Sequence, residues 1–349
     1  MTVEICTTRQ VKCVVWDLDE TLFEGVLLEG GALRLRDGVA VVVKELDRRG
    51  ILQSVASRND HDHAIERLES FGISEYFLFP QIHFGNKSES IQIIAKTLNI
   101  GIDTLAFVDD QAFERDEVSS LFPEVLCIDA ADIGTILEMA CMMPRFVTED
   151  SANRRRMYID DNERAVAEEH FEGPREEFLS GLNMRFSINL ARQDDLKRAV
   201  ELTERTNQLN ATGRTYGYDE LDELRTSPGH LLYICSLDDR YGSYGRIGLA
   251  LVEKGESAWT IRLLLMSCRV MSRGVGAILL NHIIRKSREA HKPLHADFVE
   301  TGRNRMMYVT YRFTGMREIE RTGDVCLLEL PEDSPAPGFP DYVEVLTDD

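Results

Sequence analysis

Residues 11–22 read VKCVVWDLDETL, and this stretch decides the fold of the first part of the chain. Its first eight residues are mostly apolar, rich in β-branched side chains and followed by acidic positions, as expected of a buried strand. Strands then alternate with helices of 9–13 residues as far as residue 128, which predicts an α/β fold with a parallel sheet and helices on both faces. The expected strands are 11–18, 51–56, 104–108 and 125–128, and the expected helices are 37–49, 60–71, 87–98 and 113–121.

The motif DLDETL, residues 17–22, directly follows the first expected strand. Ligands of open parallel sheets bind beyond the carboxyl ends of the strands, and Asp17 and Asp19 stand at such an end. Two carboxylates there can share Mg²⁺, which prefers oxygen ligands. One of them can attack phosphorus while the other gives a proton to the leaving oxygen. The motif favours phosphoryl transfer over the alternative, a polar loop that happens to carry two acids.

Three further features strengthen this interpretation. Ser57 follows the second strand in SVASRND, where a hydroxyl can bind a phosphoryl oxygen. Lys87 opens a helix in GNKSES and adds a fixed cation to a helix N-terminus, which already favours anions. Asp109 and Asp110 follow a later strand in LAFVDDQ, where they can complete a metal site.

These motifs, in this order, resemble the four motifs of the haloacid-dehalogenase superfamily. The resemblance implies an aspartyl-phosphate mechanism with Asp17 as nucleophile and Asp19 as acid/base. Asp17 and Asp19 are then also expected metal ligands for Mg²⁺, together with one of the two later aspartates, for which Asp110 is favoured over Asp109. The residues expected to bind the substrate are Thr21, Ser57, Arg58, Asn59 and Lys87.

The composition excludes several classes of protein. A formal net charge of −20 disfavours a general nucleic-acid binder, which needs a basic surface. No apolar run approaches the roughly 18 residues of a membrane span, and the start lacks the apolar core of a signal peptide, so a cytoplasmic location is expected. Seven scattered cysteines without a CxxC pair argue against a disulfide framework or a structural zinc site.

The second half of the chain has a different pattern. Residues 1–139 form the first expected domain, and the charge-dense residues 140–183 are an expected helical connector. Residues 184–330 predict an α+β domain, and residues 331–349 an acidic, solvated tail. The expected strands are 184–188, 230–237, 245–253, 258–266, 293–299 and 325–330, and the expected helices are 194–206, 274–288 and 303–313.

Longer strings in both halves resemble the FkbH-like family. They include VKCVVWDLDETLFEGV, FVDDQAFERDEV, LTERTNQLNATGRTY, YGSYGRIGLALVE and LLLMSCRVMSRGVG, and the resemblance extends from about residue 10 to about residue 320. It implies a haloacid-dehalogenase-like Rossmannoid domain fused to a GNAT-like α+β domain. It also implies a glyceryl transferase/phosphatase of polyketide pathways, which uses 1,3-bisphosphoglycerate and loads a glyceryl unit onto the phosphopantetheine thiol of an acyl carrier protein.

Cys268, in SCRV at the end of an expected strand, is the candidate thiol for such a transfer. Arg269 and Arg273 follow it closely and are expected to lower its pKa and bind substrate. The alternative is that Cys268 is a small buried packing residue. In MSRGVGA, Met271 stands where acetyl-CoA enzymes carry Gln or Arg, which suits a pantetheine arm better than acetyl-CoA.

The expected partners of Cys268 come from other segments. His295 and Asp297 alternate on the next strand, and either is a candidate to activate the thiol, although a strand histidine is more often structural. Asn207 and Gln208 are expected to bind glyceryl hydroxyls or pantetheine amides, with helix capping as the alternative. Asn304 is expected to orient an intermediate.

The partner and the activity have alternatives as well. A basic surface over residues 262–312 is expected to dock the acidic carrier protein, with solvated helix faces as the alternative. The competing function is a phosphatase whose second domain only recruits the substrate or docks a carrier protein.

Overall fold

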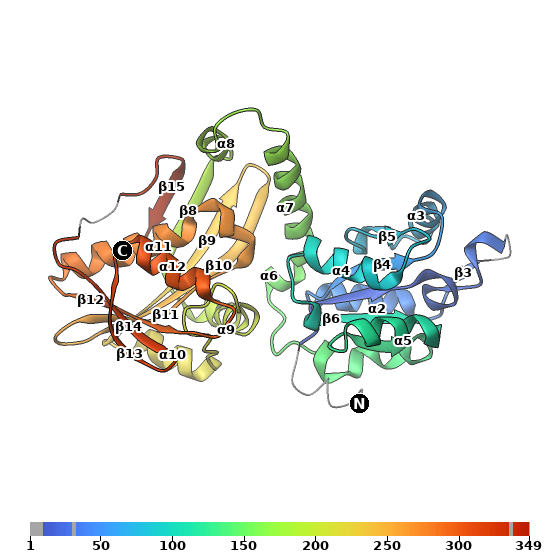
Figure 1. Cartoon of the computed structure of the whole chain (residues 1–349), viewed down its shortest axis with the longest axis horizontal. Helices are drawn as coiled ribbons and strands as arrows, with labels where there is room; N and C mark the ends of the chain where they lie inside the picture. Colours follow the sequence, from blue (N-terminus) through green and yellow to red (C-terminus); the bar gives the residue numbers. More distant parts are fainter. Residues whose placement is uncertain (1–9, 30–32, 335–337, 349) are drawn as a thin grey trace. The chain divides into compact units, whose positions relative to one another are not determined.

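The first expected strand is β1, Cys13–Trp16, which lies at the centre of a five-stranded parallel sheet with the order β5-β4-β1-β6-β7. The computed structural model describes residues 10–29, 33–334 and 338–348, and the chain divides between Ile159 and Asp160 into two compact units. The sheet confirms the parallel α/β fold predicted for the first unit (Figure 1). Its other strands are β4 Leu52–Ser57, β5 Gln81–Ile82, β6 Leu105–Asp109 and β7 Leu126–Asp129.

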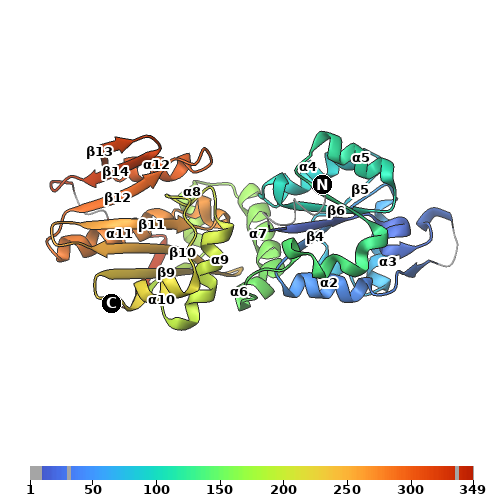
Figure 2. The same ribbon diagram turned by 90° about the horizontal axis from the view of Figure 1, so that it is seen from below.

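Alternation along β1 supplies the cores on both faces of the sheet. Val14 and Trp16 join one buried cluster, whereas Cys13 and Val15 join the other. Helices α2 and α3 pack on the first cluster and α4 and α5 on the second, as Figure 2 shows for α2, α4 and α5. The bounds are α2 Val39–Arg48, α3 His61–Ser70, α4 Lys87–Thr97 and α5 Ala112–Leu121.

Shorter elements complete the first unit. A two-stranded ribbon, β2 Phe23–Glu24 with β3 Arg34–Leu35, follows the tight helical turn η1 Leu18–Leu22. The other short turns are η2 Leu27–Glu29, η3 Ser74–Tyr76, η4 Ile102–Thr104, η5 Ala130–Glu138 and η6 Ala140–Met142. Two helices follow, α6 Glu149–Ala152 and α7 Arg154–Glu169, and the boundary between the units falls within α7.

The second unit is built on an eight-stranded mixed sheet with the order β13-β14-β12-β11-β10-β9-β8-β15, which can be followed in Figure 2 from β13 to β9. It confirms the predicted α+β class. The strands are β8 Met184–Leu190, β9 His230–Asp239, β10 Gly242–Lys254, β11 Trp259–Met266, β12 Leu294–Val299, β13 Arg317–Thr322, β14 Val325–Leu330 and β15 Val343–Thr347. The helices are α8 Arg175–Gly181, α9 Leu196–Arg205, α10 Tyr218–Thr226, α11 Val275–Glu289 and α12 Arg305–Phe313, with short turns η7 Gln193–Asp195 and η8 Cys268–Arg273.

The parallel strands β11 and β12 pair over only three residues each, 259–261 with 294–296. Beyond this point the segment Leu209–Ala211 lies between them. The backbone N–H of Ala211 donates to the carbonyl of Leu264 at 2.9 Å, and the N–H of Val299 donates to the carbonyl of Ala211 at 3.0 Å. The segment therefore satisfies backbone groups that the divergence of the two strands would leave unpaired.

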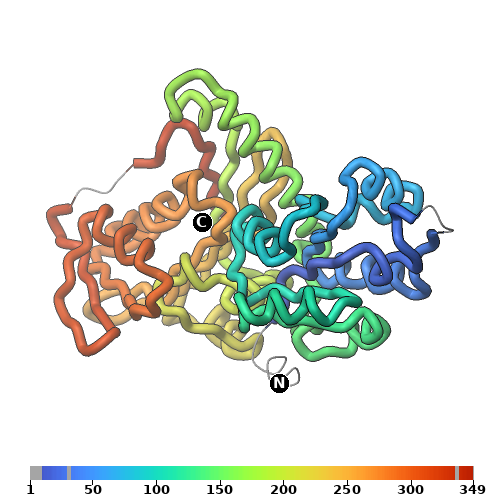
Figure 3. The backbone as a smooth tube through the Cα atoms, turned by 45° about the vertical axis from the view of Figure 1, so that its right-hand side comes forward, coloured from blue at the N-terminus to red at the C-terminus, as the bar shows by residue number. Residues whose placement is uncertain are grey.

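The acidic tail is not only a solvated extension, as the sequence predicted. Val343–Thr347 forms β15, which pairs in parallel with the edge strand β8, and Val343 is buried in the core of the second unit. Figure 3 shows the last residues in dark red. The prediction of a wholly solvated tail was wrong because it relied on the acidic and proline-rich composition of the segment. The alternation of apolar and polar residues in VEVLT, which is typical of a strand, was overlooked. Strand β13 was missed for a related reason, since all of its residues are exposed at a sheet edge.

The structure bears on two expectations drawn from composition, the lack of a membrane-spanning helix and the lack of disulfides. Over the described ranges, no helix is both long and apolar enough to cross a bilayer. Cys141 is disulfide-bonded, which the scattered cysteines did not predict, whereas Cys13, Cys127, Cys235, Cys268 and Cys326 are not disulfide-bonded.

A buried ion pair holds α7 to the β9–β10 hairpin of the second unit. The guanidinium of Arg164 donates to both carboxylate oxygens of Asp239, at 2.8 and 2.9 Å, and both side chains are fully buried. Arg164 also donates to Asp161 at 2.8 Å and stacks 3.8 Å from the ring centre of Tyr244. Because every charge in this cluster has a geometrically good partner, the removal of one leaves the others buried and uncompensated.

We therefore expect Arg164→Ala to lower the free energy of unfolding of the second unit by about 3–5 kcal/mol. Arg192→Ala, in an arginine whose side chain is 78% exposed, should change it by less than about 0.5 kcal/mol. The two tryptophans lie in different units, so urea unfolding followed by the fluorescence of Trp259 in a Trp16→Phe background reports on the second unit. Equal losses in the two arginine variants would show that the buried pair has no special role.

Candidate active site

The register of the parallel sheet brings the predicted motifs together at one edge. Trp16 of β1 lies opposite Val55 of β4 and Val108 of β6, so the residues that follow these positions emerge side by side. The backbone N–H of Asp17 donates to the carbonyl of Val108 at 2.9 Å, which fixes the start of the DLDETL loop beside β6. Ser57 ends β4 and Asp109 ends β6, as the sequence predicted.

Lys87 is the centre of this site. Its Nζ lies 2.9 Å from Oδ1 of Asp17 and donates to Oδ2 of Asp109 at 2.5 Å, and all three side chains are at most 5% exposed. The second oxygen of Asp109 accepts the backbone N–H of Gln111 at 2.8 Å. Lys87 and Asp17 are therefore joined directly, and Asp109 holds the lysine in place.

The pKa values at this site follow from burial and pairing. Burial raises the pKa of Asp17 to about 6, against the opposing effect of Lys87. Burial lowers the pKa of Lys87, but the carboxylates of Asp17 and Asp109 outweigh this effect, so its pKa is raised and it stays protonated. Burial and the charge of Asp109 raise the pKa of Asp110. These carboxylates are thus crowded enough to benefit from an additional cation.

The residues present fit a divalent metal ion. Ligand oxygens of Asp17, Asp109 and Asp110 lie within 4.8 Å of one another. Both oxygens of Asp109 already accept protein donors, whereas Oδ1 of Asp110 is buried with no hydrogen-bond partner among the described residues. Asp17 and Asp110 would therefore hold Mg²⁺, whose charge would offset the repulsion between the carboxylates and an incoming phosphoryl group.

Asp19 and Asn59 form a second hydrogen-bonded pair beside Asp17. Oδ1 of Asp19 accepts the backbone N–H of Leu27 at 2.9 Å, and its Oδ2 accepts Nδ2 of Asn59 at 3.0 Å. Nδ2 of Asn59 also lies 3.2 Å from Oγ of Ser57. The expected acid/base and the expected phosphoryl-binding hydroxyl are thus joined through one amide. Leu27, whose backbone holds Asp19, was not predicted, because no sequence pattern marks a backbone donor.

Two residues expected to bind substrate have other partners. Oγ1 of Thr21 accepts the backbone N–H of Asp110 at 3.1 Å and is fully buried, so Thr21 ties the loop after β1 to the loop after β6. Arg58 lies 3.1 Å from the buried carboxylate of Glu114 and donates to the carbonyl of Gly85 at 3.2 Å. Both side chains hold loops of the site together. The full burial of Thr21 corrects its predicted contact with substrate, whereas that of Arg58, whose side chain is 39% exposed, stays a prediction.

In the second unit, the structure brings Cys268 and Gln208 together. The N–H of Met266 donates to the carbonyl of Leu209 at 2.9 Å, which aligns the residues on either side of this bond. Sγ of Cys268 lies 3.9 Å from Oε1 of Gln208. The thiol is half-buried, and Asn207 and Gln208 are exposed. Of the two polar residues in TNQ, Gln208 therefore lies next to the thiol.

His295 and Asp297 do not lie beside Cys268. His295 pairs in register with Thr260 at the start of β11, and the six residues from there to Met266 span about 20 Å at the usual rise of a strand. His295 contacts Glu329 at 3.3 Å, and Asp297 accepts from Arg262 at 2.9 Å. Their predicted role in activating the thiol is wrong. They lie beside the first half of β11, whereas Cys268 follows its last residue.

The arginines after Cys268 are committed elsewhere. Arg269 donates to the carbonyl of Tyr244 at 2.8 Å and lies 3.9 Å from Asp161, and the buried Arg273 pairs with Glu168 at 2.8 Å. These contacts fasten η8 to the second unit. Sequence spacing did not reveal these partners, and the substrate-binding role of Arg269 and Arg273 stays a prediction.

Asn304 is also structural. It is fully buried, and its Nδ2 lies within hydrogen-bond distance of the carbonyls of Asn210, at 2.9 Å, and Val299, at 2.8 Å. Its Oδ1 accepts the N–H of Thr301 at 3.1 Å. Asn304 thus locks the segment between β11 and β12, which corrects its expected role in orienting an intermediate.

The chain's own tail lies against the glycine loop before α11. Gly274 adopts a left-handed conformation with φ of 75°, and a Cβ built on it would lie 2.8 Å from the hydroxyl of Tyr342. The start of α11 is therefore packed against Tyr342.

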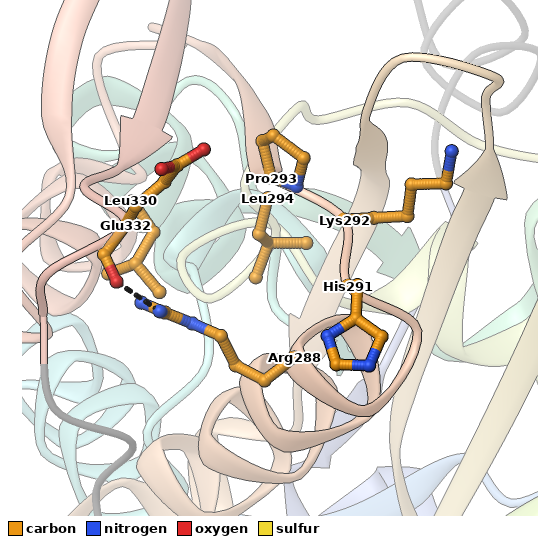
Figure 4. Close-up of a pocket in the computed structure, with 7 residues that line it drawn as sticks. All are labelled: Arg288, His291, Lys292, Pro293, Leu294, Leu330 and Glu332. Atoms are coloured by element: carbon orange, nitrogen blue, oxygen red, sulfur yellow. Dashed lines mark hydrogen bonds between the residues drawn. The ribbon is translucent and has the colours of Figure 1, made fainter.

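A pocket of about 320 Å³ lies at the other end of α11, bordered by β12 and β14 (Figure 4). Arg288 lines it, but its guanidinium donates to the carbonyls of Pro331, Glu332 and Ser334 and so anchors the chain after β14. Lys292 donates to the carbonyl of Glu256. The expected basic docking surface is thus partly structural, because several of its cations are bound by the chain itself.

Comparisons with known proteins give only distant likenesses. No family model and no curated protein matches the chain. It is similar to the N-terminal part of a Bacteroides fragilis protein containing a phosphatase domain complexed with Mg, at 27% identity and a TM-score of 0.33, over 41% of this chain and 43% of that one. The chain thus spans less than half the length of this neighbour.

Two acetyltransferases give similar scores. One is the ribosomal-protein-S18-alanine N-acetyltransferase of Escherichia coli, at 15% identity and a TM-score of 0.33, over 42% of this chain and 93% of that one. The other is the spermidine/spermine N-acetyltransferase SpeG of Vibrio cholerae in mutant form, at 13% identity and a TM-score of 0.32, over 41% and 92%. All three TM-scores lie below 0.5, so these likenesses carry no functional conclusion.

The site distinguishes the two candidate metal ligands after β6. Asp110→Asn should weaken Mg²⁺ binding at least about tenfold, the loss seen even for partners that only orient a ligand. Asp109→Asn should mainly destabilise the first unit, because it leaves Lys87 without one of its buried partners. Magnesium titration calorimetry and thermal unfolding of both variants measure the two effects. A stable Asp109→Asn protein that loses Mg²⁺ more completely than Asp110→Asn would reverse the assignment.

Proposed function

We propose that the first unit is a Mg²⁺-dependent phosphatase that acts through an aspartyl phosphate on Asp17. The observation that carries this proposal is the buried ion pair between Lys87 and Asp17, at 2.9 Å, beside Ser57 and a cluster of three carboxylates. A carboxylate held next to an ammonium group is both fixed in direction and kept ionised, which a nucleophile requires.

The reaction divides into two steps. In the first, Oδ1 or Oδ2 of Asp17 forms a bond to phosphorus, the bond from phosphorus to the ester oxygen breaks, and that oxygen takes a proton from Asp19. In the second, water attacks the aspartyl phosphate, Asp19 takes a proton from the water, and the carboxylate of Asp17 leaves as phosphate forms. Lys87 and Ser57 bind phosphoryl oxygens in both steps.

For the second unit, the proposal is acyl transfer from 1,3-bisphosphoglycerate to the phosphopantetheine thiol of an acyl carrier protein. The thiolate of Cys268 attacks the acyl carbon, a carbon–sulfur bond forms, and phosphate leaves with the electron pair of the broken carbon–oxygen bond. The carrier thiolate then attacks this thioester and releases Cys268. The sequence resemblance supports this reaction, and Gln208, 3.9 Å from the thiol, is suited to bind the acyl hydroxyl or pantetheine amide.

One observation favours the alternative, a phosphatase whose second unit only docks a carrier protein. His295 and Asp297, the predicted activating groups, are paired with Glu329 and Arg262 away from Cys268. In this alternative the thiol has no chemical role, and the fate of an acyl group on Cys268 distinguishes the two functions.

Asp17→Asn should abolish phosphate release, by at least about 10³-fold, because a neutral amide is a poor nucleophile. Circular dichroism should show a folded protein whose first unit is less stable, because Lys87 loses one buried partner and keeps Asp109. Asp62→Asn is the matched control, since the Asp62 side chain is 98% exposed, and it should retain full activity. Activity that survives either Asp17→Asn or complete chelation of Mg²⁺ would exclude the proposed mechanism.

Cys268→Ala should lose carrier loading while keeping phosphatase activity towards a phosphomonoester, because Asp17 belongs to the other unit. With 1,3-bisphosphoglycerate, the unchanged protein should form a glyceryl or phosphoglyceryl adduct that peptide mass spectrometry places on Cys268 and hydroxylamine removes. Normal loading by Cys268→Ala would mean that the pantetheine thiol attacks directly and that the second unit acts by positioning alone.

A further inference from the structure

Asn59 makes contacts that a substrate-binding residue would not need. It is 2% exposed, and its single Nδ2 atom serves two acceptors, Oδ2 of Asp19 at 3.0 Å and Oγ of Ser57 at 3.2 Å. Asp19 is held from the other side by the backbone N–H of Leu27 at 2.9 Å. The carboxylate of Asp19 is therefore clamped between a backbone donor and the amide of Asn59.

The amide of Asn59 also carries an energetic cost. Its Oδ1 is buried and has no hydrogen-bond partner in the part of the chain that the structure describes. A buried acceptor left unsatisfied is unfavourable, because it has lost its hydrogen bonds to water without gaining a protein partner. The amide cannot turn over to relieve this cost, because its oxygen would then face the carboxylate of Asp19. The amide keeps this orientation because Asp19 and Ser57 both accept hydrogen bonds from its nitrogen.

We propose that Asn59 is a positioning residue that holds Asp19 in the direction required for proton transfer to the leaving oxygen. This inference rests on the proposed phosphatase function. Asn59 ties the acid/base to Ser57, which binds the phosphoryl group, so a single amide sets the spacing between the proton donor and the phosphorus atom. This positioning role differs from the direct contact with substrate that the sequence predicted for Asn59.

The consequence is a dependence on the leaving group. An alkyl phosphate such as 3-phosphoglycerate expels an alkoxide and needs a proton from Asp19, whereas p-nitrophenyl phosphate expels a stable phenolate and needs little help. A residue that acts mainly through Asp19 should therefore matter far more for the first substrate than for the second, and the loss of its contact to Ser57 should cost both substrates equally. A residue that merely supports the fold should affect both equally.

The experiment compares Asn59→Ala, Asp19→Asn and the double variant on both substrates with Mg²⁺ present. Asn59→Ala should lower kcat for 3-phosphoglycerate by about 10²-fold, the usual contribution of a positioned acid. It should change kcat for p-nitrophenyl phosphate by less than about threefold. Because both changes remove the same proton transfer, the double variant should be no slower on 3-phosphoglycerate than Asp19→Asn.

Two further variants guard against trivial results. Asn59→Leu keeps the branched shape of the side chain and removes the donor without leaving a cavity, so it should behave like Asn59→Ala. Gln92→Ala removes an exposed amide on α4 and should leave both activities unchanged. Equal losses on the two substrates, or additive losses in the double variant, would overturn the positioning role. If the unchanged protein hydrolyses neither ester, the phosphatase function itself is wrong and the inference fails with it.

Discussion

The structure of the first unit depends on a lysine buried between two carboxylates. Lys87 lies against Asp17 and Asp109, and isolated burial of any one of these three charges would be prohibitively unfavourable. Their mutual pairing makes the arrangement stable, and the loops after β1 and β6 and the start of α4 are fixed by it. With Asp110 added, three carboxylates face one ammonium group, so ionised carboxylates leave negative charge that a divalent cation can balance.

The convergence of these groups was predictable because it is a property of the backbone. In a parallel sheet the carboxyl ends of neighbouring strands meet at one edge, so the positions of Asp17, Ser57 and Asp109 along the chain are sufficient to place them together. The partners of Thr21 and Arg58 were not predictable in this way. They depend on a backbone N–H of the loop after β6 and on Glu114 of α5, and no local pattern records such long-range pairing.

In the second unit, the order of the strands along the chain does not determine which residues meet. The strands β11 and β12 were predicted correctly as consecutive strands. No pattern indicated that they diverge after three paired residues or that Leu209–Ala211 lies between them. That inserted segment explains both outcomes for the predicted site. It brings Gln208 to Cys268, and it requires Asn304 as a structural clamp. The prediction for His295 considered only which face of the sheet its side chain occupies. Its position along β12, opposite the start of β11, keeps it away from the thiol.

The two proposed nucleophiles suit the two electrophilic centres of an acyl phosphate that also carries a phosphomonoester. A carboxylate beside a lysine and a metal site is matched to phosphorus, where charge on the phosphoryl oxygens must be neutralised before attack. A thiol is matched to an acyl carbon, because the thioester it forms remains activated for a second transfer. In the proposed reaction the phosphatase site must spare that thioester, and its selectivity follows from its dependence on phosphoryl oxygens for binding. The acyl group offers Lys87 and the metal site no comparable anionic charge, so proximity alone would not make it a substrate for Asp17.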